Sequence, residues 1–376
     1  MLTIEKVDTE NRSQVKRFVK LPHRLYKDCP QWVPLLNIDA YAYLNRKKHP
    51  FHEHSEVDFF LAVRDGKDVG RICTIENKPY NQYHHTKKAN FYFFDCENEQ
   101  EAAGAIFETA FEWARDRGLD TIVGPKGMGP LDGYGLLVFG HEHRNTMTML
   151  NYNYAYYQEL VEAQGFEKEV DFVSCYLPAE NFKIPERVDR IAQRVMERGN
   201  LQIKRFKNKK ELLQWANRIG RAYNDSFVNN WEYFPLSQRE IDFVVDNIMM
   251  VADYRLIKII VHEGEAVGFL FAFPDVSGAL QRAKGKLNPL SLIDLLIDMK
   301  RTKGVAVNGM GILPEHQGRG GNAILYSEMG HTLLDFGQFV HVEMTQVAES
   351  AEQMRADLKN LNGVEYKNHR VYRKSL

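Results

Sequence analysis

Two stretches of the sequence that lie far apart carry the same pattern of residues. Val63–Ile72 aligns with Val261–Leu270, and each contains an acidic residue and a glycine followed, three positions later, by Val-Gly. At the same offset, Leu160–Glu167 falls on Leu358–Glu365. Two separate segments that agree on one offset indicate a duplicated unit. This repeat constrains the fold more than any other feature of the chain.

Each copy is predicted to be a mixed α+β unit, of the broad α/β class, in which a mixed sheet is flanked by helices. In the first copy, apolar runs predict strands at 59–63, 69–75, 91–94 and 121–123 and an amphipathic helix at 102–117. The same order begins again at 255–261 and 267–273. We expect two tandem domains, residues 1–179 and 180–376, which also suits the length of 376 residues.

A strand, a glycine-rich turn and a helix follow one another in the second copy. Val305–Leu313 is an apolar run that Pro314 ends, Gln317–Gly321 is rich in glycine, and a helical pattern begins at Asn322. Free N–H groups at a helix N-terminus bind phosphate well. The Walker and Rossmann patterns are absent. An ordinary left-handed turn that leads into a helix is the alternative.

The segment Pro314–Gly321 resembles the acetyl-CoA loop of the GNAT superfamily of N-acetyltransferases, whose pattern is Q/R-x-x-G-x-G/A. Gln317 and Gly320 match, whereas Asn322 stands where Gly or Ala is usual. The resemblance implies that acetyl-CoA or another acyl-CoA is the cosubstrate. The implied cofactor-binding residues are Ile312, Leu313, Gln317, Gly318, Arg319, Gly320, Gly321 and Asn322.

The whole chain resembles a bacterial family of tandem GNAT proteins with no settled substrate. The resemblance covers nearly all of the sequence, and its recognisable stretches include Trp32-Val-Pro34, His49-Pro-Phe51, Gly135-Leu-Leu137 and 223–236. It implies two GNAT-like domains.

The two copies differ where a pyrophosphate would bind. After Phe94 the first copy has four carboxylates, Asp95, Glu97, Glu99 and Glu101, instead of glycines. Each would repel a phosphate by roughly 1 kcal/mol at 4 Å even in water, although acidic residues suit a helix N-terminus. We expect only the second copy to bind CoA, and the first copy to be degenerate: a scaffold or one wall of the acceptor cleft.

The resemblance also implies where the chemistry takes place. In GNAT enzymes, backbone N–H groups hold the thioester carbonyl where two central strands part, which points to Gly311 and Ile312. The tyrosine acid usual in the superfamily is replaced by Lys359. Tyr366 and Tyr372, with His369 between them, are candidate acids on the last strand, although polar strand residues commonly just face solvent.

An aromatic and amide-rich segment precedes Pro235. In a GNAT fold this region covers the acceptor cleft, and such clusters suit ligand recognition. A packed aromatic corner between the copies is an equal alternative. The candidate substrate-binding residues are Tyr223, Asn224, Asn230, Trp231 and Tyr233.

An insertion at 277–303 holds the apolar run Leu290–Met299, with lysines and an arginine on both sides. The favoured interpretation is an amphipathic helix packed on its domain. A lid over the site, or a membrane-surface contact through 284–303, remains open.

Composition narrows the function classes. The net charge of −1 predicts no nucleic-acid partner. The absence of a CxxC pair gives no sign of a metal site, and the absence of a long apolar run predicts a soluble, cytoplasmic chain. The leading hypothesis is an acyl-CoA-dependent N-acyltransferase with a small or lipid-like amine acceptor. The alternatives are a non-catalytic acyl-CoA sensor or scaffold and an aminoacyl-tRNA-dependent peptidyl transferase.

Overall fold

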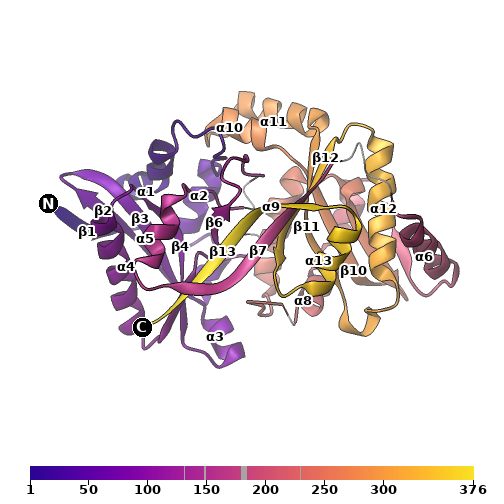
Figure 1. Ribbon diagram of the computed structural model, residues 1–376, viewed down its shortest axis with the longest axis horizontal. Helices are drawn as coiled ribbons and strands as arrows, with labels where there is room; N and C mark the ends of the chain where they lie inside the picture. The colour runs from indigo at the N-terminus through magenta and orange to yellow at the C-terminus, as the bar shows by residue number, and fades with distance from the viewer. Residues whose placement is uncertain (131, 148–149, 179–183, 229) are drawn as a thin grey trace. The chain divides into compact units, whose positions relative to one another are not determined.

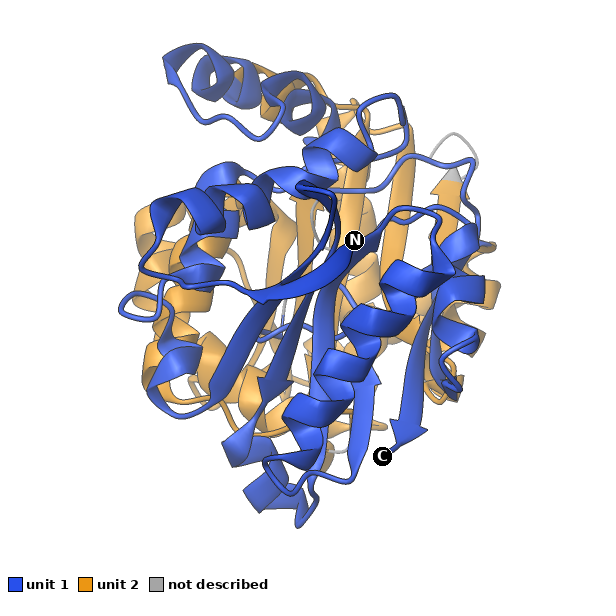
Figure 2. Cartoon of the chain, turned by 90° about the vertical axis from the view of Figure 1, so that its left-hand side faces the viewer, with its two compact units in different colours: residues 1–173, 276–296, 366–376 blue, residues 174–275, 297–365 orange. Residues whose placement is uncertain are grey.

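The computed structural model describes residues 1–376 except 131, 148–149, 179–183 and 229. The chain forms two compact units, shown in different colours in Figure 2. Unit 1 consists of residues 1–173, 276–296 and 366–376, and unit 2 of residues 174–275 and 297–365. The boundary expected at 179/180 lies outside the described residues. Two segments from the second half of the chain thus belong to unit 1.

The helices and strands are labelled in Figure 1. Those of unit 1 are β1 (Leu2–Lys6), α1 (Arg12–Leu25), α2 (Asn37–Leu44), η1 (Pro50–Glu53), β2 (Glu56–Arg64), β3 (Lys67–Glu76), α3 (Lys78–His84), β4 (Lys88–Cys96), α4 (Gln100–Arg115), β5 (Thr121–Gly124), β6 (Leu136–Phe139), α5 (Tyr156–Glu162) and α10 (Ser277–Ala283).

Those of unit 2 are α6 (Glu186–Glu197), β8 (Gln202–Lys204), α7 (Lys209–Gln214), α8 (Ala216–Ser226), α9 (Gln238–Val251), η3 (Tyr254–Leu256), β9 (Ile257–His262), β10 (Glu265–Pro274), β11 (Gly304–Ile312), η4 (Pro314–His316), α12 (Gly321–Phe336), β12 (His341–Ala348) and α13 (Glu352–Asn360). Three elements have residues in both units: β7 (Glu167–Pro178), α11 (Pro289–Arg301) and β13 (Val364–Ser375).

The sheet of unit 1 has the strand order β1-β2-β3-β4-β5-β13. Strands β4 and β5 run parallel, and the other neighbours in this order are antiparallel. Strand β13 ends the second sequence copy, yet it pairs with β5 of the first, with Tyr372 opposite Gly124. The first copy therefore completes its sheet with a strand from the second.

Helices cover both faces of this sheet. One buried cluster joins the strands to α4 and α5 through residues such as Phe91, Phe107 and Tyr157. The other joins the strands to α1 and α2 through residues such as Phe18 and Phe59. Two apolar layers of this kind hold a sheet that is buried on both sides.

The sheet of unit 2 has the order β12-β11-β10-β9-β8. Strands β11 and β12 run parallel, and the remaining pairs are antiparallel. Helix α8 packs on β10 and β11, whereas α12 packs on β9 and against α6. None of the described helices combines the length and the apolar character that crossing a membrane requires.

The structure confirms the repeat. Both hairpins turn through two residues with positive φ, Asp65 and Gly66 in the first and Glu263 and Gly264 in the second, as a tight primed turn requires. Strands β4 and β11 each have 9 residues, and helices α4 and α12 each have 16. The bulged residues of β4 and β11 also correspond, as described below.

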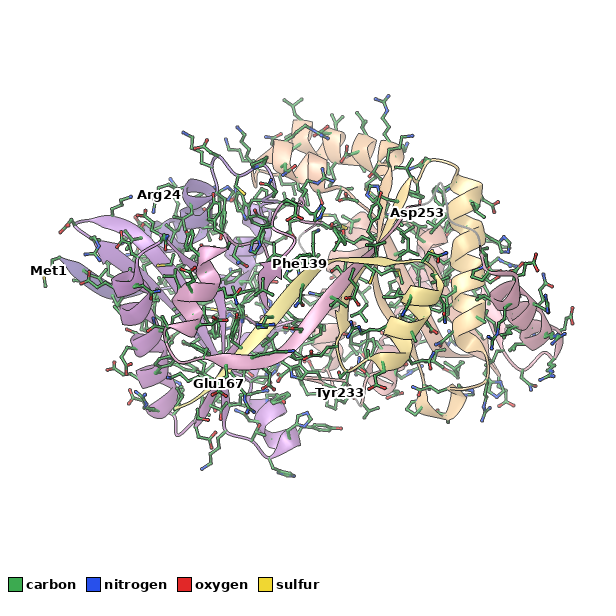
Figure 3. All side chains as sticks on the ribbon, viewed as in Figure 1. Met1, Arg24, Phe139, Glu167, Tyr233 and Asp253 are labelled. Carbon is green, nitrogen blue, oxygen red and sulfur yellow. The ribbon has the colours of Figure 1, made fainter. Side chains whose placement is uncertain are left out.

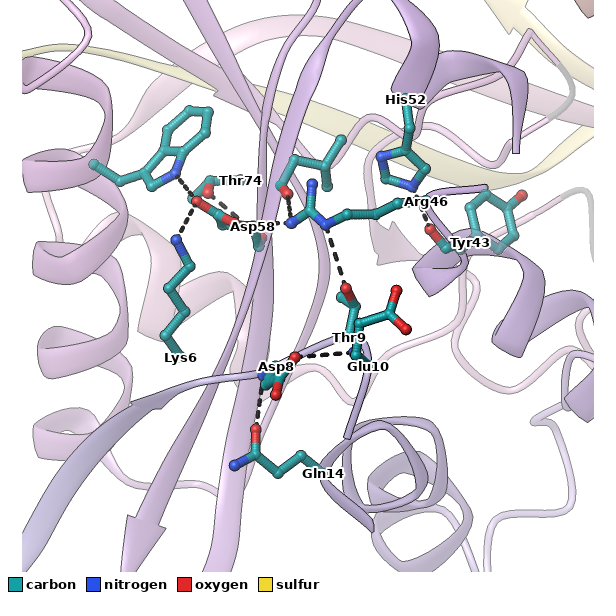
Figure 4. A network of polar contacts seen from close by, with 12 residues as sticks. Lys6, Asp8, Thr9, Glu10, Gln14, Tyr43, Arg46, His52, Asp58 and Thr74 are labelled. Carbon is teal, nitrogen blue, oxygen red and sulfur yellow. Dashed lines mark hydrogen bonds and ion pairs between the residues drawn. The ribbon is translucent and has the colours of Figure 1, made fainter. Parts of the chain in front are cut away.

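A buried carboxylate anchors the outer part of unit 1 (Figure 4). Asp58 on β2 accepts hydrogen bonds from Lys6 Nζ at 2.8 Å and Trp113 Nε1 at 2.7 Å, and from Arg46 Nη2 at 3.0 Å. Although burial works to raise it, these partners together lower the pKa of Asp58. The carboxylate links β1, β2, α4 and the segment after α2.

The buried histidine of β13 predicts a loss of stability in mild acid. His369 is fully enclosed in unit 1, where its Nε2 lies 2.9 Å from the Asn151 carbonyl oxygen, and burial lowers its pKa to about 4. In the unfolded chain this histidine has the ordinary pKa of about 6.5. Its contribution to stability is therefore fully present above that pH and falls as the pH drops towards 4.

From this histidine alone we expect the free energy of unfolding to fall by about 2 kcal/mol between pH 7 and pH 5. In His369→Gln, whose amide can still donate to the Asn151 carbonyl, that share of the pH dependence should disappear. Denaturant unfolding at the two pH values measures it, with the exposed His85→Asn as the control. If His369→Gln and the unmodified protein showed equal pH dependence, protonation of His369 would not be the cause of the loss of stability.

Candidate functional site

Strands β11 and β12 of unit 2 pair over only part of their length. Their parallel ladder runs from Gly304 opposite His341 to Val307 opposite Met344, and β11 continues to Ile312 along β10. The register between β10 and β11 shifts after Val307, and Gly309 has a φ of 105°. This bulge makes β11 part from β12, so that Gly311 and Ile312 lie beyond the ladder.

The glycine loop, Gln317–Asn322, follows directly. Gly318 and Gly320 have φ values of 72° and 85°, conformations that favour glycine. Gly320 is the N-cap of α12 and provides no side-chain cap, so the first turn of the helix presents backbone N–H groups. Gln317 Nε2 donates to the Ile312 carbonyl oxygen at 2.9 Å. The end of the strand and the loop are therefore fixed to each other.

The charge around this loop suits an anion. Arg319 is exposed, and within the described part of the chain no carboxylate forms an ion pair with it. Burial, and then the nearby His262 and Arg319, lower the pKa of His316. Asn322 Nδ2 lies 3.3 Å from Asp357 Oδ2 on α13, which also accepts from the Tyr326 hydroxyl. The helix dipole, the N–H groups and Arg319 together can hold a phosphate.

Helix α8 forms a wall beside the end of β11. The ring of Tyr223 stacks on Phe269 of β10 with centroids 5.9 Å apart, and Phe227 meets the same ring edge-on. A Cβ added to Gly311 would lie 2.8 Å from Ser226 Cβ and 2.9 Å from Phe269 Cζ. Only glycine fits there, because α8 and β10 approach the strand so closely.

Ser226 contributes a buried hydroxyl to this wall. The residue is 9% exposed, and its Oγ has no hydrogen-bond partner in the described part of the chain. Buried polar groups are usually paired, so an unpaired hydroxyl beside Gly311 is a candidate contact for a substrate. Burial also raises the pKa of Tyr223, which keeps its phenol neutral.

The other candidate acceptor residues lie on or near the loop between α8 and α9. Asn224 closes this loop, because its side-chain amide exchanges two hydrogen bonds of 3.2 Å with the backbone of Leu236. Asn230, Trp231 and Tyr233 lie within it, and Asn230 is exposed while the two rings are half-buried. Tyr233 is labelled in Figure 3. The structure thus places Tyr223 at the strand end and gives Asn224 the role of shaping the loop.

The candidate acids on β13 belong to unit 1. The Tyr372 hydroxyl donates to Glu162 Oε1 at 3.0 Å, and its ring lies in the buried cluster of α4 and α5. Tyr366 accepts from Lys367 Nζ at 3.1 Å and meets the ring of His143 edge-on. His369 bonds to the Asn151 carbonyl. Each of these three side chains therefore has a structural partner in its own unit.

The equivalent place in unit 1 carries ion pairs. Gly70 pairs with Cys96 in unit 1 as Gly268 pairs with Ile312 in unit 2, so Cys96 is the counterpart of Ile312. By the same count Phe93, which has a φ of 49°, is the counterpart of Gly309. Here the Cys96 N–H donates to the Tyr157 hydroxyl at 3.1 Å. The N–H of Cys96 in unit 1 therefore already has a partner, whereas the corresponding N–H of Ile312 in unit 2 would face a ligand.

The four carboxylates of this loop are all neutralised by cations. Asp95 binds the buried Arg71 at 2.7 Å. Glu97 pairs with Lys67 at 2.8 Å and with Arg24, which is labelled in Figure 3. Glu99 and Glu101 pair with Arg64. The acidic turn is therefore held by ion pairs and is not an open anion site.

A cavity of about 110 Å³ lies inside unit 1. Its lining combines aromatic rings, such as Trp32, Phe93 and Tyr152, with polar groups that include Asp95 and Asn151. The Asn151 amide donates to the carbonyls of Gly133 and Gly135, and Asp95 is held by Arg71 and Tyr26. These polar groups are held by hydrogen bonds within unit 1, and the cavity lining is a mixture of polar and apolar surface.

Sequence reasoning missed Ser226 and Phe269. Phe269 is a strand residue among several phenylalanines, and Ser226 lies within the aromatic and amide-rich segment without any pattern of its own. The Ser226 hydroxyl is a candidate contact only because it is buried beside Gly311, and no local sequence pattern predicts that burial.

The comparison with known structures concerns the fold. No protein-family model matches the chain. The tandem GNAT protein from the clavulanic acid biosynthesis pathway, solved without AcCoA, matches with a TM-score of 0.57 at 12% sequence identity. The match covers 100% of this chain and 98% of that protein. The chain therefore has the fold of the GCN5-related N-acetyltransferases in tandem.

Two curated proteins are similar over nearly their whole length. The bacterial ceramide synthase of Caulobacter vibrioides (strain NA1000 / CB15N) is 29% identical over 384 residues, which cover 98% of this chain and 97% of that protein. Protein YghO of Escherichia coli (strain K12) is 23% identical over 373 residues, which cover 97% and 94%.

Proposed function

We propose that the chain is an N-acyltransferase that moves an acyl group directly from acyl-CoA to the amine of a lipid-like acceptor. The observation that carries the proposal is the glycine loop at the start of α12, placed immediately after the end of β11. It brings an anion site and the open strand end at Gly311 into one segment of unit 2.

In this proposal the loop Gln317–Asn322 binds the CoA pyrophosphate. The backbone at Gly311 and Ile312 binds the thioester carbonyl and stabilises the negative charge that develops on its oxygen when the amine attacks. The carbonyl carbon then forms a C–N bond and loses its C–S bond. The thiolate of CoA leaves with a proton that derives from the attacking amine.

Helix α8 is proposed to form one side of the acceptor site. Tyr223 and Phe269 give it an apolar aromatic surface, and the Ser226 hydroxyl can accept a hydrogen bond from the incoming amine or donate one to the thioester. An apolar wall with one polar group is typical of sites for small or lipid-like ligands.

The proposed acceptor class is supported by one of the similar proteins. The similarity to a protein named ceramide synthase extends over nearly the full length of both chains. A ceramide is the amide of a fatty acid and a long-chain amino alcohol, so we propose a long-chain amine as the acceptor class. The aminoacyl-tRNA alternative loses support, because the glycine loop suits CoA and the net charge of −1 does not favour RNA.

The test is turnover with defined substrates. The purified full chain is incubated with acyl-CoAs of different lengths and with three acceptors: a long-chain amino alcohol, its N-acetylated form and a small water-soluble amine. We expect release of CoA thiol and an N-acyl product with the first acceptor alone. Tight acyl-CoA binding without release of thiol to any amine would favour the sensor hypothesis instead.

A further inference from the structure

Helix α11 exposes its apolar side chains. The exposed fractions are 79% for Leu290, 54% for Ile293, 51% for Leu296, 44% for Ile297 and 42% for Leu292. Leu290, Ile293 and Ile297 follow one another at the spacing of a single helix face. The sequence favoured a helix packed through its apolar side, and the structure instead leaves most of that side open.

Little of α11 is packed against the protein. Asp294 binds Arg282 of the neighbouring α10 through two contacts of 2.8 and 3.1 Å, and only Leu295 among the leucines of the helix is buried. Helices α10 and α11 lie side by side in Figure 1. A helix on a soluble protein normally has the opposite arrangement, with its apolar face inward. An exposed apolar face of this size marks an interaction surface.

Positive charges surround this face. Five exposed cations lie just before α11, in its last turn or just after it, and no carboxylate in the described ranges of the chain forms an ion pair with any of them: Lys284, Lys286, Lys300, Arg301 and Lys303. The carboxylate of Asp294 on the same helix is already held by Arg282. A further lysine is close, since burial and then the charge of Lys286 lower the pKa of Lys20.

We propose that α11 docks on the surface of an anionic lipid membrane. The leucine and isoleucine face inserts at the boundary between headgroups and acyl chains, and the flanking lysines and arginine bind the phosphates. An apolar stripe bordered by cations is the arrangement by which helices lie on membranes, and anionic lipids attract clustered basic residues. A second protein copy would have to bury five unpaired cations against identical cations, which charge repulsion opposes.

The inference is independent of the acyl-transfer proposal, because its residues lie on α11 and beside its ends and not on the glycine loop. It adds a reason why a lipid-like acceptor would be within reach: a chain held at the membrane surface meets acceptors that partition there.

The test is binding of the full chain to vesicles. Co-sedimentation is measured with vesicles of phosphatidylcholine alone and with vesicles that contain about 30% phosphatidylglycerol, at low and high salt. We expect binding to the anionic vesicles that salt weakens. The variant Leu290→Ser/Ile293→Ser/Ile297→Ser should lose at least about tenfold of this binding while keeping its thermal unfolding temperature.

The matched control is Leu213→Ser/Met250→Ser/Val364→Ser, which removes three exposed apolar side chains elsewhere and should bind as the unmodified chain does. Replacement of Lys284, Lys286 and Lys300 by glutamine should weaken binding to anionic vesicles alone. Vesicle binding that the α11 variant leaves unchanged would overturn the proposal. The proposal would also be wrong if the unmodified chain did not bind vesicles but sedimented as a dimer, and if the α11 variant sedimented as a monomer.

Discussion

Gly318→Glu is expected to lower the affinity for CoA by at least about 100-fold, because it places a carboxylate inside the proposed anion site. The space allows the test, since a Cβ at Gly318 meets no atom within 4 Å. Gly320 is less suitable, because its Cβ would lie 2.8 Å from Val195 Cγ2 of α6 and a substitution there would disturb the packing of the helix. Calorimetric titration with CoA measures the effect.

Two controls separate charge from backbone strain. Gly318→Gln imposes the same strain at a φ of 72° without the charge and should bind CoA within about tenfold of the unmodified chain. Gly66→Glu adds a carboxylate at a similar φ of 79° in the hairpin of unit 1, also in open space, and should bind normally. If Gly318→Glu and Gly318→Gln bound CoA equally well, the pyrophosphate assignment would be wrong.

The same titration tests the degenerate copy. We expect one CoA per unmodified chain and none in Gly318→Glu, because the acidic turn of unit 1 is filled with ion pairs and its Cys96 N–H is bound to Tyr157. The full chain is the right material, since residues 1–179 alone lack β13, whose Tyr372 lies in the core of unit 1. A second site that survives in Gly318→Glu would assign CoA binding to unit 1.

The elements of the two copies could be predicted because each depends on a local pattern. The Asp65-Gly66 turn, the apolar run of β11 and the glycines before α12 require only neighbouring residues. Strand partners depend on distant residues. The alternation in 364–375 predicts a strand, yet nothing in it says that this strand pairs with β5 of the first copy. Helix α1 also runs through Pro22, where the Phe18 carbonyl that loses its helical donor accepts a hydrogen bond from Arg71 Nη1 at 2.9 Å instead.

The candidate site shows the same limit. The loop Gln317–Asn322 is contiguous in sequence, so its motif reveals it. The wall made by Ser226 and Phe269 arises from the approach of α8 to β10, which depends on tertiary packing. The face of α11 is a third case: periodicity shows that Leu290, Ile293 and Ile297 share one side of a helix. Only the structure shows that this side is turned away from the protein.

Gly311→Ala is expected to reduce kcat by at least about 100-fold, more than any substitution of a candidate acid on β13. The added methyl group would approach Ser226 Cβ and Phe269 Cζ within 3 Å, so the strand end or α8 must move. A displacement of about 1 Å at a reacting centre can cost 10²-fold in rate. Gly70→Ala is the control, since this strand glycine of unit 1 meets its nearest neighbours at 3.3 to 3.5 Å.

Tyr366→Phe and Tyr372→Phe are expected to keep kcat within about 10-fold of the unmodified enzyme, well below the 10²–10⁴-fold that one general acid supplies. Their hydroxyls bond to Lys367 and Glu162, so they support unit 1 rather than the thioester. Catalysis then rests on positioning and on backbone donors near Gly311. Turnover of acyl-CoA and amine is measured for each variant, with CoA affinity and thermal unfolding as checks on folding. If Tyr366→Phe alone silenced a folded enzyme that still bound acyl-CoA, Tyr366 would be the general acid and the positioning account would be wrong.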